Sequence, residues 1–273
     1  MTDLSAKPLA LIKGAGDLAT GVALRLHHVG FRLVMTEIEE PTVVRRTVAL
    51  AEAVYEGESV VEGMKAVLAR GADEAREILE DGNIAVLIDP RADIKGQLQP
   101  NLLVDAVMAK RNLGTTIDDA RVVVALGPGF EAGVDAHAVV ETNRGHSLGR
   151  VLYSGYAQAN TGVPGEVGGA SAERVLRAPA DGEFTGAAKI GDRVAAGDTV
   201  AFVDETPVKS EIDGILRGLL RSGIRVTEGF KVGDVDPRAQ FQHCHTVSDK
   251  ALSVGGGVLE AAGHLLGVFR VRG

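Results

Sequence analysis

The stretch Leu9–Glu37 most constrains the fold, because it has the pattern of a strand, a glycine turn, a helix and a second strand. Ala10–Lys13 and Phe31–Thr36 are short, mainly apolar runs. Between them, Gly14–Ala19 matches G-x-G-x-x-G/A, and apolar residues then recur at helical spacing. Such a βαβ unit predicts an α/β protein with a Rossmann-like parallel sheet.

The glycine turn also predicts a site for a nucleotide. Gly14 permits the tight turn, and Gly16 lets the backbone approach a phosphate. The helix that follows offers free N–H groups and a partial positive charge. Glu37 closes the second strand, where an acid can bind ribose hydroxyls. Asp17 either caps the helix or repels a pyrophosphate, and both interpretations stay open.

Composition excludes several classes of function. The chain has 273 residues, enough for more than one domain, and a net charge of −8. That charge argues against binding nucleic acid through a basic surface. The sequence contains no run of about 18 apolar residues, the length that a membrane-spanning helix requires. We therefore expect a cytoplasmic protein. Cys244 is the single cysteine, which excludes an intrachain disulfide and a multi-cysteine metal site.

The chain between these features alternates predicted strands and helices. Ile84–Ile88 and Val122–Leu126 are continuous apolar runs, as expected for strands buried on both faces. Ser59–Ala69 has the pattern of two paired strands, and Ala72–Leu79 that of a helix. Asn101–Asn112 also has helical spacing, which predicts a further helix.

A polar constellation follows the second buried strand. If the chain is extended from residue 134 to 141, then Asp135, His137 and Glu141 share one face. Two carboxylates and a histidine can bind a metal or transfer protons, so Asp135 and His137 are candidate catalytic residues. A solvated strand face is the alternative. Arg144 is suited to an oxyanion such as phosphate.

The chain contains an internal repeat with an offset of 32 residues. Ala180–Asp204 and Ile212–Asp236 share glycines, valines and aspartates at equivalent positions. Two such halves resemble the barrel-sandwich hybrid of biotinyl and lipoyl carrier domains. Lys209 lies in a strand rather than at the hairpin tip where carriers hold their modified lysine. We therefore expect neither biotin nor lipoate, and a role for this module in docking.

Cys244 stands between two histidines near the C-terminal end of the sequence. A protonated histidine would lower the pKa of the thiol and make it nucleophilic, so Cys244 is a third candidate catalytic residue. The three side chains are also able to hold a soft metal. The alternative is a buried, unreactive thiol.

A triple glycine precedes the predicted helix Val258–Leu266. Gly255, Gly256 and Gly257 are expected to open that helix and form a second cradle for an anion, with Lys250 adding positive charge. The helix needs an apolar surface, so we expect the tail to pack back on the first domain. The predicted domains are 1–172, a Rossmann-like domain; 173–238, the biotinyl/lipoyl-like module; and 239–273, the returning segment.

The combined motifs resemble one family, the YqeB-type accessory proteins of selenium-dependent molybdenum hydroxylases. The residues that carry the resemblance are Gly14–Leu26, Val34–Gly57, Ala125–Val151, Asn160–Gly169, Arg177–Gly182 and Ser248–Ala261.

The resemblance implies a maturation factor that handles molybdenum cofactor, or helps to place its selenium or sulfur ligand, with the hydroxylase as partner. Binding of a phosphate-bearing cofactor or dinucleotide by the two glycine cradles would fit that role. An NAD(P)-dependent oxidoreductase and a non-enzymatic docking scaffold are the alternatives. Assembly into a homo-oligomer is also left open.

Overall fold

The computed structural model describes residues 7–160, 162 and 165–267, and the chain divides into two compact units. Unit 1 combines Met1–Glu39, Leu50–Asn160 and Val247–Gly273, and unit 2 combines Glu40–Ala49 and Thr161–Thr246. This division differs from the expected boundaries. Residues 40–49 and 239–246 both belong with the repeat, because their contacts are made there.

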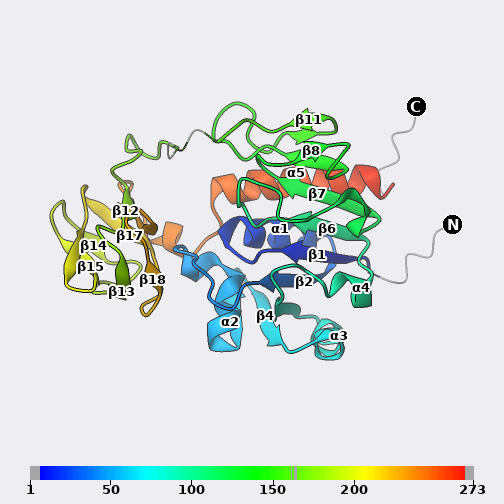
Figure 1. Ribbon diagram of the computed structural model, residues 1–273, viewed down its shortest axis with the longest axis horizontal. Coiled ribbons are helices and arrows are strands. Elements are labelled where there is room, and N and C mark those ends of the chain that lie inside the picture. The colour runs from blue at the N-terminus through cyan, green and yellow to red at the C-terminus, as the bar shows by residue number, and fades with distance from the viewer. Residues whose placement is uncertain (1–6, 161, 163–164, 268–273) are drawn as a thin grey trace. The chain divides into compact units, whose positions relative to one another are not determined.

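Unit 1 is built on a nine-stranded sheet in the described part of the chain, with the order β10-β9-β7-β6-β1-β2-β5-β4-β3 (Figure 1). The strands from β9 to β4 in that order are parallel, and β10 and β3 are antiparallel edge strands. The strands are β1 Leu9–Lys13, β2 Arg32–Glu37, β3 Glu58–Val61, β4 Met64–Ala69, β5 Ile84–Ile88, β6 Leu102–Asp105, β7 Val122–Leu126, β9 Ala138–Val140 and β10 Val151–Leu152. A separate pair is β8 Glu131–Ala132 and β11 Gly155–Tyr156.

Helices cover both faces of this sheet, as its continuous apolar strands require. Helices α1 and α5 pack against each other, and both contact the sheet. The helices of unit 1 are α1 Asp17–His28, α2 Ala53–Glu56, α3 Ala72–Glu80, α4 Lys95–Leu98 and α5 Asp249–Leu265, with 3-10 turns η2 Leu50–Glu52 and η3 Ile117–Asp119.

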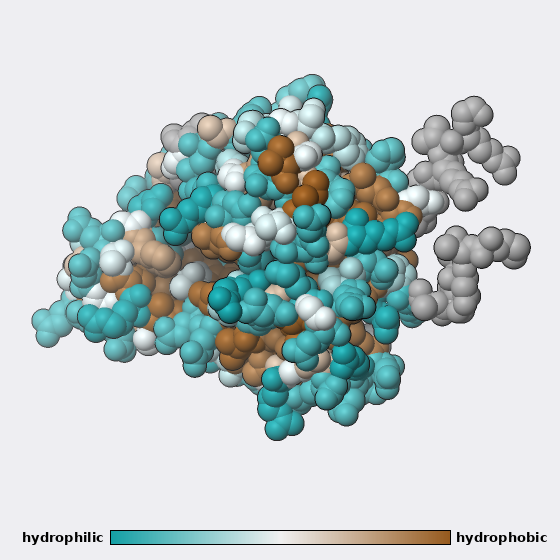
Figure 2. Space-filling model, turned by 45° about the vertical axis from the view of Figure 1, so that its right-hand side comes forward, coloured by the Kyte–Doolittle hydropathy of each residue, from teal (hydrophilic) through white to brown (hydrophobic). Residues whose placement is uncertain are grey.

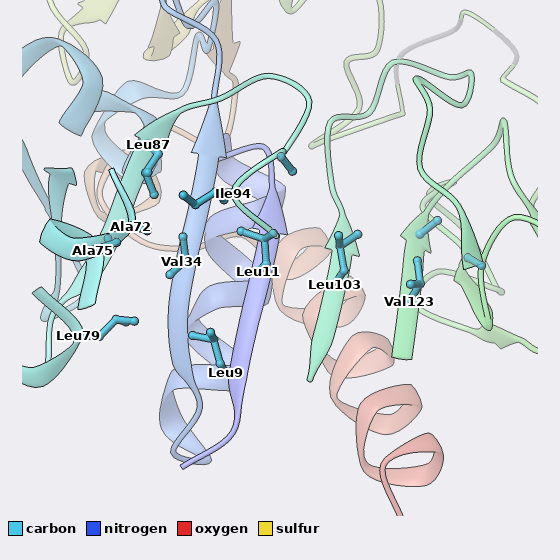
Figure 3. Packing of buried hydrophobic residues seen from close by; sticks show 14 of the residues in the cluster. Leu9, Leu11, Val34, Ala72, Ala75, Leu79, Leu87, Ile94, Leu103 and Val123 are labelled. Atoms are coloured by element: carbon cyan, nitrogen blue, oxygen red, sulfur yellow. The ribbon is translucent and has the colours of Figure 1, made fainter. Parts of the chain in front are cut away.

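One layer of the core lies between the sheet and α3 (Figure 3). Leu9 and Leu11 of β1 pack in one cluster with Ala75 and Leu79 of α3. Successive strand residues point to opposite faces, so the equally buried Ile12 faces the layer of α1 and α5. The βαβ unit predicted from Leu9–Glu37 is thus confirmed as β1, α1 and β2.

Most predicted elements of unit 1 are confirmed, but the helix predicted over Asn101–Asn112 is wrong. The strands β5 and β7 have the predicted bounds, and β3, β4 and α3 occur where expected. Asn101–Asn112 is not a helix: it forms β6 and then an irregular loop. Leu102, Leu103 and Val104 are buried between β1 and β7, and this tertiary pairing overrides the helical spacing.

Unit 2 consists of two four-stranded antiparallel sheets in the described residues, ordered β12-β19-β17-β14 and β16-β15-β13-β18. Its strands are β12 Val175–Arg177, β13 Gly182–Gly186, β14 Arg193–Val194, β15 Thr199–Val203, β16 Thr206–Lys209, β17 Gly214–Leu219, β18 Arg225–Val226 and β19 Lys231–Asp236. Two 3-10 turns, η1 Arg46–Val48 and η4 Phe241–Cys244, complete the unit.

The repeat governs how these strands pair. Strands β13, β14 and β15 return 32 residues later as β17, β18 and β19. The first strand of each copy pairs with the third strand of its own copy and with the second strand of the other copy. The two copies are therefore structurally equivalent and interlocked. Lys209 ends β16 opposite Thr199, away from the turn at Asp204 and Glu205.

The described surface mixes polar and apolar residues. On the face drawn in Figure 2, hydrophilic residues predominate and apolar patches lie between them. None of the described helices is long and apolar enough to cross a membrane.

Candidate functional site

The carboxyl edge of the parallel sheet is the candidate site. Strand β1 is followed by β2 on one side, whereas β6 and β7 lie on the other side, so the strand order reverses between β1 and β6. In open α/β sheets, ligands bind at the carboxyl ends of the strands where the order reverses. The predicted glycine turn follows β1 directly, so the topology places it at this reversal.

The turn itself is shaped by its protein neighbours. Gly14 has φ +96°, and a Cβ there would lie 3.0 Å from the carbonyl oxygen of Ala106. Glycine is therefore required for the turn and for close passage of the chain that leaves β6. Gly16 precedes α1 as its N-cap in an extended conformation, without a side-chain cap.

The side chain of Glu37 binds the backbone of the glycine turn. Its two carboxylate oxygens accept hydrogen bonds from the backbone N–H of Ala15 and of Ile38, each at 2.9 Å. Burial raises the pKa of Glu37, and these two hydrogen bonds offset only part of that rise. The acid expected to bind a ribose thus already holds the turn, although a carboxylate can accept further hydrogen bonds.

The second turn of α1 packs on the first turn of α5. A Cβ on Gly21 of α1 would lie 2.6 Å from the Cβ of Ala251 in α5. Each helix carries its own acid in the first turn, Asp17 in α1 and Asp249 in α5. The hydroxyl of Ser248 caps α5 by accepting the N–H of Ala251 at 3.2 Å.

The prediction that the triple glycine opens a helix is wrong. Helix α5 begins at Asp249, so Gly255, Gly256 and Gly257 lie in its interior, where their N–H groups belong to the helix. A Cβ on Gly255 would lie 2.5 Å from the carbonyl oxygen of Gly21. A Cβ on Gly257 would lie 2.3 Å from that of Gly149. Gly255 and Gly257 thus serve close packing, and the triple glycine does not form an anion cradle.

Arg144 binds an acid of the protein. Its guanidinium forms two hydrogen bonds to the carboxylate of Asp249, at 2.7 and 3.0 Å. Lys250 follows in the same first turn of α5. The structure thus brings Arg144 and Lys250 together at the start of α5, beside the start of α1.

The polar constellation does not form a shared strand face, because β9 spans only Ala138–Val140. Asp135 accepts the backbone N–H of Glu131 at 2.8 Å, and the Nδ1 atom of His137 accepts that of Val123 at 3.0 Å. Buried Glu141 accepts two backbone N–H groups, from residues 143 and 158. Each side chain is used to hold local backbone, which corrects the expected metal or proton-transfer cluster.

A buried cluster at the same edge was not predicted. The ammonium of Lys13, at the end of β1, donates to the hydroxyl of Thr115 at 3.1 Å, and that hydroxyl donates to Asp105 at 2.6 Å. Lys13 and Asp105 are 3.6 Å apart and almost wholly buried. The sequence feature that could have indicated this cluster is Lys13 itself, a charged residue at the end of an apolar strand. The cluster ties the ends of β1 and β6 to the loop after β6.

Large apolar side chains are exposed at the ends of neighbouring strands. Ile38 follows β2, Ile88 ends β5 beside it, and Val107 follows β6. They are 41%, 47% and 37% exposed. Such residues suit the flat, apolar face of a ligand ring.

Cys244 belongs to unit 2, and its surroundings there correct the expected nucleophile. It ends η4, is fully buried, and has its Sγ atom 3.9 Å from the carbonyl oxygen of Leu216. Burial raises the pKa of the thiol, and the charges of Arg217 and Arg45 oppose this more weakly. A buried thiol with a raised pKa is a poor nucleophile.

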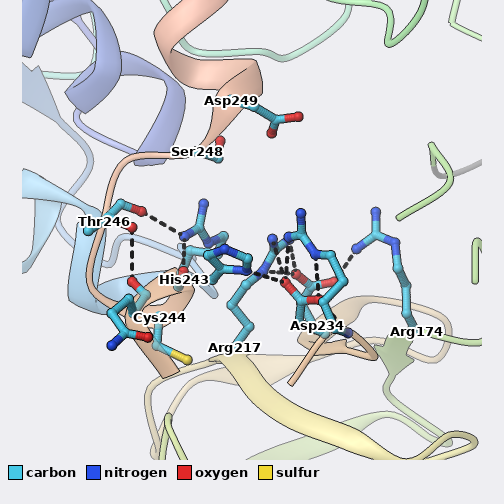
Figure 4. A network of polar contacts seen from close by, with 12 residues as sticks. Arg174, Arg217, Asp234, His243, Cys244, Thr246, Ser248 and Asp249 are labelled. Carbon is cyan, nitrogen blue, oxygen red and sulfur yellow. Dashed lines mark hydrogen bonds and ion pairs between the residues drawn. The ribbon is translucent and has the colours of Figure 1, made fainter. Parts of the chain in front are cut away.

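An ion cluster lies near Cys244 in the same unit (Figure 4). Arg217 of β17 binds Asp234 at 2.6 and 2.9 Å and Asp236 at 3.2 Å. Arg174 also pairs with Asp234, and Arg238 with Asp236. Burial alone would raise the pKa of Asp236, but the hydrogen bonds from Arg238 and the charge of Arg217 lower it to about 2. The cluster fastens strands of unit 2 together.

No group of three or more histidine, cysteine, aspartate or glutamate side chains able to hold a metal occurs among the described residues. This applies to the His243, Cys244 and His245 segment as well as to the Asp135 segment.

Sequence comparison gives one strong match. The chain is 53% identical over 257 residues to the uncharacterized protein YqeB of Escherichia coli (strain K12), covering 94% of this chain and 48% of the relative. This similarity agrees with the resemblance to YqeB carried by the sequence motifs. The chain spans about half the length of that YqeB relative. No family model matches the chain.

Comparison with solved structures gives only weak similarity. An aspartoacylase family protein of Mesorhizobium loti has a TM-score of 0.29 at 11% identity, covering 86% of this chain and 87% of the other. A succinylglutamate desuccinylase/aspartoacylase of Rhodobacter sphaeroides has a TM-score of 0.26 at 13% identity, covering 83% and 86%. Similarity at this level says nothing about activity.

Proposed function

We propose that this chain binds a phosphate-bearing cofactor, a nucleotide or the dinucleotide form of molybdenum cofactor, at the carboxyl edge of its parallel sheet. The observation that carries the proposal is the reversal of strand order between β1 and β6 beside the glycine turn. The exposed isoleucines Ile38 and Ile88 support it, because burying them against a base removes apolar surface from water.

The biological role we propose is maturation of a selenium-dependent molybdenum hydroxylase. It rests on the resemblance of the glycine turn, the Ala125–Val151 segment and the α5 segment to YqeB-type accessory proteins. In this role the chain carries the cofactor to the hydroxylase and releases it there.

Unit 2 is the docking module in this proposal. We interpret its two sheets as a barrel-sandwich hybrid of the biotinyl/lipoyl type without a prosthetic group. The exchange of strands between the two repeat copies supports this interpretation. Lys209 lies in β16, pairs with Thr199 of β15 and is not at a hairpin tip, so in this proposal the module offers a surface rather than a swinging arm.

The proposal is tested by identifying what the protein binds. The chain is purified from its host, and the bound compounds are identified by mass spectrometry with elemental analysis for molybdenum and selenium. ADP, CDP and GDP are then titrated into ligand-free protein by calorimetry. We expect a co-purified organic phosphate, and saturable binding of at least one nucleotide. Absence of both at millimolar nucleotide would refute the proposal.

Two variants locate the site. Ile88→Gln is expected to weaken nucleotide binding several-fold, because its side chain no longer covers an apolar ring. Val29→Gln is the matched control, since Val29 is also exposed but lies at the far end of α1 from the glycine turn. Equal effects of the two substitutions would place the ligand elsewhere.

A further inference from the structure

The loop after β6 is seated between two glycine turns of the carboxyl edge. A Cβ on Gly14, after β1, would lie 3.0 Å from the carbonyl oxygen of Ala106. A Cβ on Gly129, after β7, would lie 2.6 Å from both the backbone N and the Cα of Arg111. Both glycines have positive φ, +96° and +106°. The two turns therefore hold the 106–111 segment close on either side.

Two residues of this segment adopt a conformation that is unfavourable for their type. Met108 and Lys110 both have φ +62°, in the left-handed region that glycine and asparagine occupy more readily. The base of the loop is fixed by Asp105, which accepts the N–H of Val107 at 3.2 Å and the hydroxyl of Thr115 at 2.6 Å. Non-glycine residues persist in such conformations only where the surroundings impose them, and such residues concentrate at functional sites.

The loop presents two adjacent cations. Lys110 and Arg111 are exposed, and neither side chain forms an ion pair or hydrogen bond with another residue in the described part of the chain. By contrast, the exposed Arg70, after β4, is paired with Glu74, and the exposed Arg91, after β5, is paired with Asp93. The loop therefore presents two adjacent cations without an ion-pair partner among the described residues, on a chain with a net charge of −8.

The backbone donors beside the loop are already engaged. Glu37 accepts the N–H of Ala15 in the glycine turn, and Ser248 accepts the N–H of Ala251 in α5. Asp17 and Asp249 add negative charge to the first turns of the two helices. A phosphate placed on either helix start would meet these oxygens and their charge, so the helix starts are poor anion sites.

We propose that Lys110 and Arg111 bind the phosphates of the ligand. The inference rests on the proposed nucleotide binding and adds its recognition chemistry. The ligand is a nucleoside diphosphate or the pyrophosphate of a dinucleotide, held by side-chain cations of the 106–111 segment. Arg111 supplies the planar fork that matches two phosphate oxygens, and Lys110 supplies a point charge. This differs from the usual arrangement, in which the glycine turn and the helix start hold the pyrophosphate.

The test compares a nucleoside with its diphosphate in matched variants. Lys110→Asn with Arg111→Gln removes both charges, and asparagine tolerates the left-handed backbone at position 110. Arg32→Gln with Arg121→Gln is the control pair, removing two exposed cations at the opposite, amino ends of β2 and β7. Each protein is titrated with the nucleoside diphosphate that wild type binds and with the corresponding nucleoside. Pyrophosphate alone is included as a competitor.

In wild type the diphosphate is expected to bind more tightly than the nucleoside, and pyrophosphate is expected to compete. The loop variant should lose at least tenfold in diphosphate affinity while its nucleoside affinity stays within twofold. The control pair should change neither. Unchanged diphosphate affinity in the loop variant, with nucleotide binding intact, would overturn this inference and leave the proposed function standing. Absence of nucleotide binding in wild type would overturn both.

Discussion

Adjacent glycines of α5 offer a strict test of the helix packing. Gly255 packs against α1, where a Cβ would lie 2.5 Å from the carbonyl oxygen of Gly21 and 2.9 Å from the Cγ of Arg25. Gly256 is its neighbour in the same helix, and a Cβ there would meet nothing within 4 Å. The same substitution, glycine to alanine, should therefore have opposite effects at the two positions.

The magnitudes follow from two opposing terms. Alanine in a helix interior is favoured over glycine by about 1 kcal/mol, and Gly256→Ala should gain roughly that amount. Gly255→Ala gains the same term but forces α1 and α5 apart, and overpacking costs about 1–3 kcal/mol. A backbone oxygen at 2.5 Å cannot rotate away, so we expect a cost of about 2–3 kcal/mol and a net loss of about 1–2 kcal/mol.

The assay is equilibrium unfolding in urea, followed by far-UV circular dichroism. Gly256→Ala should raise the free energy of unfolding, and Gly255→Ala should lower it, giving a difference of about 2–3 kcal/mol between the variants. Gly257→Ala is a second case, because its Cβ would lie 2.3 Å from the carbonyl oxygen of Gly149. If all three variants were equally stable, the close contact of α5 with α1 and the Gly149 loop would be refuted.

Two further predictions concern unit 2. Asp236 has its pKa lowered from 3.8 to about 2 and is almost wholly buried, so its ionised form stabilises the fold by about 2 kcal/mol. That contribution is present above about pH 4 and is lost as the pH falls toward 2. Urea titrations at several pH values should therefore show that the free energy of unfolding falls less steeply with acid in Asp236→Asn than in wild type. Buried Cys244 has a raised pKa, so a thiol reagent such as DTNB should react at least tenfold faster in urea than with the native protein. Rapid labelling of the native thiol would contradict its burial.

The sequence predicted those elements whose local pattern agrees with their tertiary surroundings. Ile84–Ile88 and Val122–Leu126 are apolar throughout and became strands buried on both faces. Asn101–Asn112 failed because its first residues pair with β1 and β7, whereas its helical spacing is only local. The start of the C-terminal helix was also predicted wrongly, at the triple glycine. The triple glycine stands just before the apolar run that was predicted as the helix, but it lies inside α5, where Gly255 contacts α1.

The location of the candidate site could be predicted from the sequence, but the residues that form it could be predicted only in part. The glycine turn and Glu37 follow adjacent strands, so their position at one edge of the sheet follows from the pattern. That Glu37 would bind the turn depends on a hydrogen bond across 22 residues, which spacing does not reveal. Lys13, Asp105 and Thr115 were missed because their association requires β6, the strand interpreted as a helix.

The division of unit 1 into three stretches of chain has a consequence for its biosynthesis. Helix α5, which covers α1, begins at Asp249, after the whole of the repeat has been translated. Until then, the apolar side of α1 that packs against α5 is not covered by that helix. We expect unit 2 to fold on the ribosome first, while unit 1 waits for its last segment and relies on a chaperone or a partner in the interval.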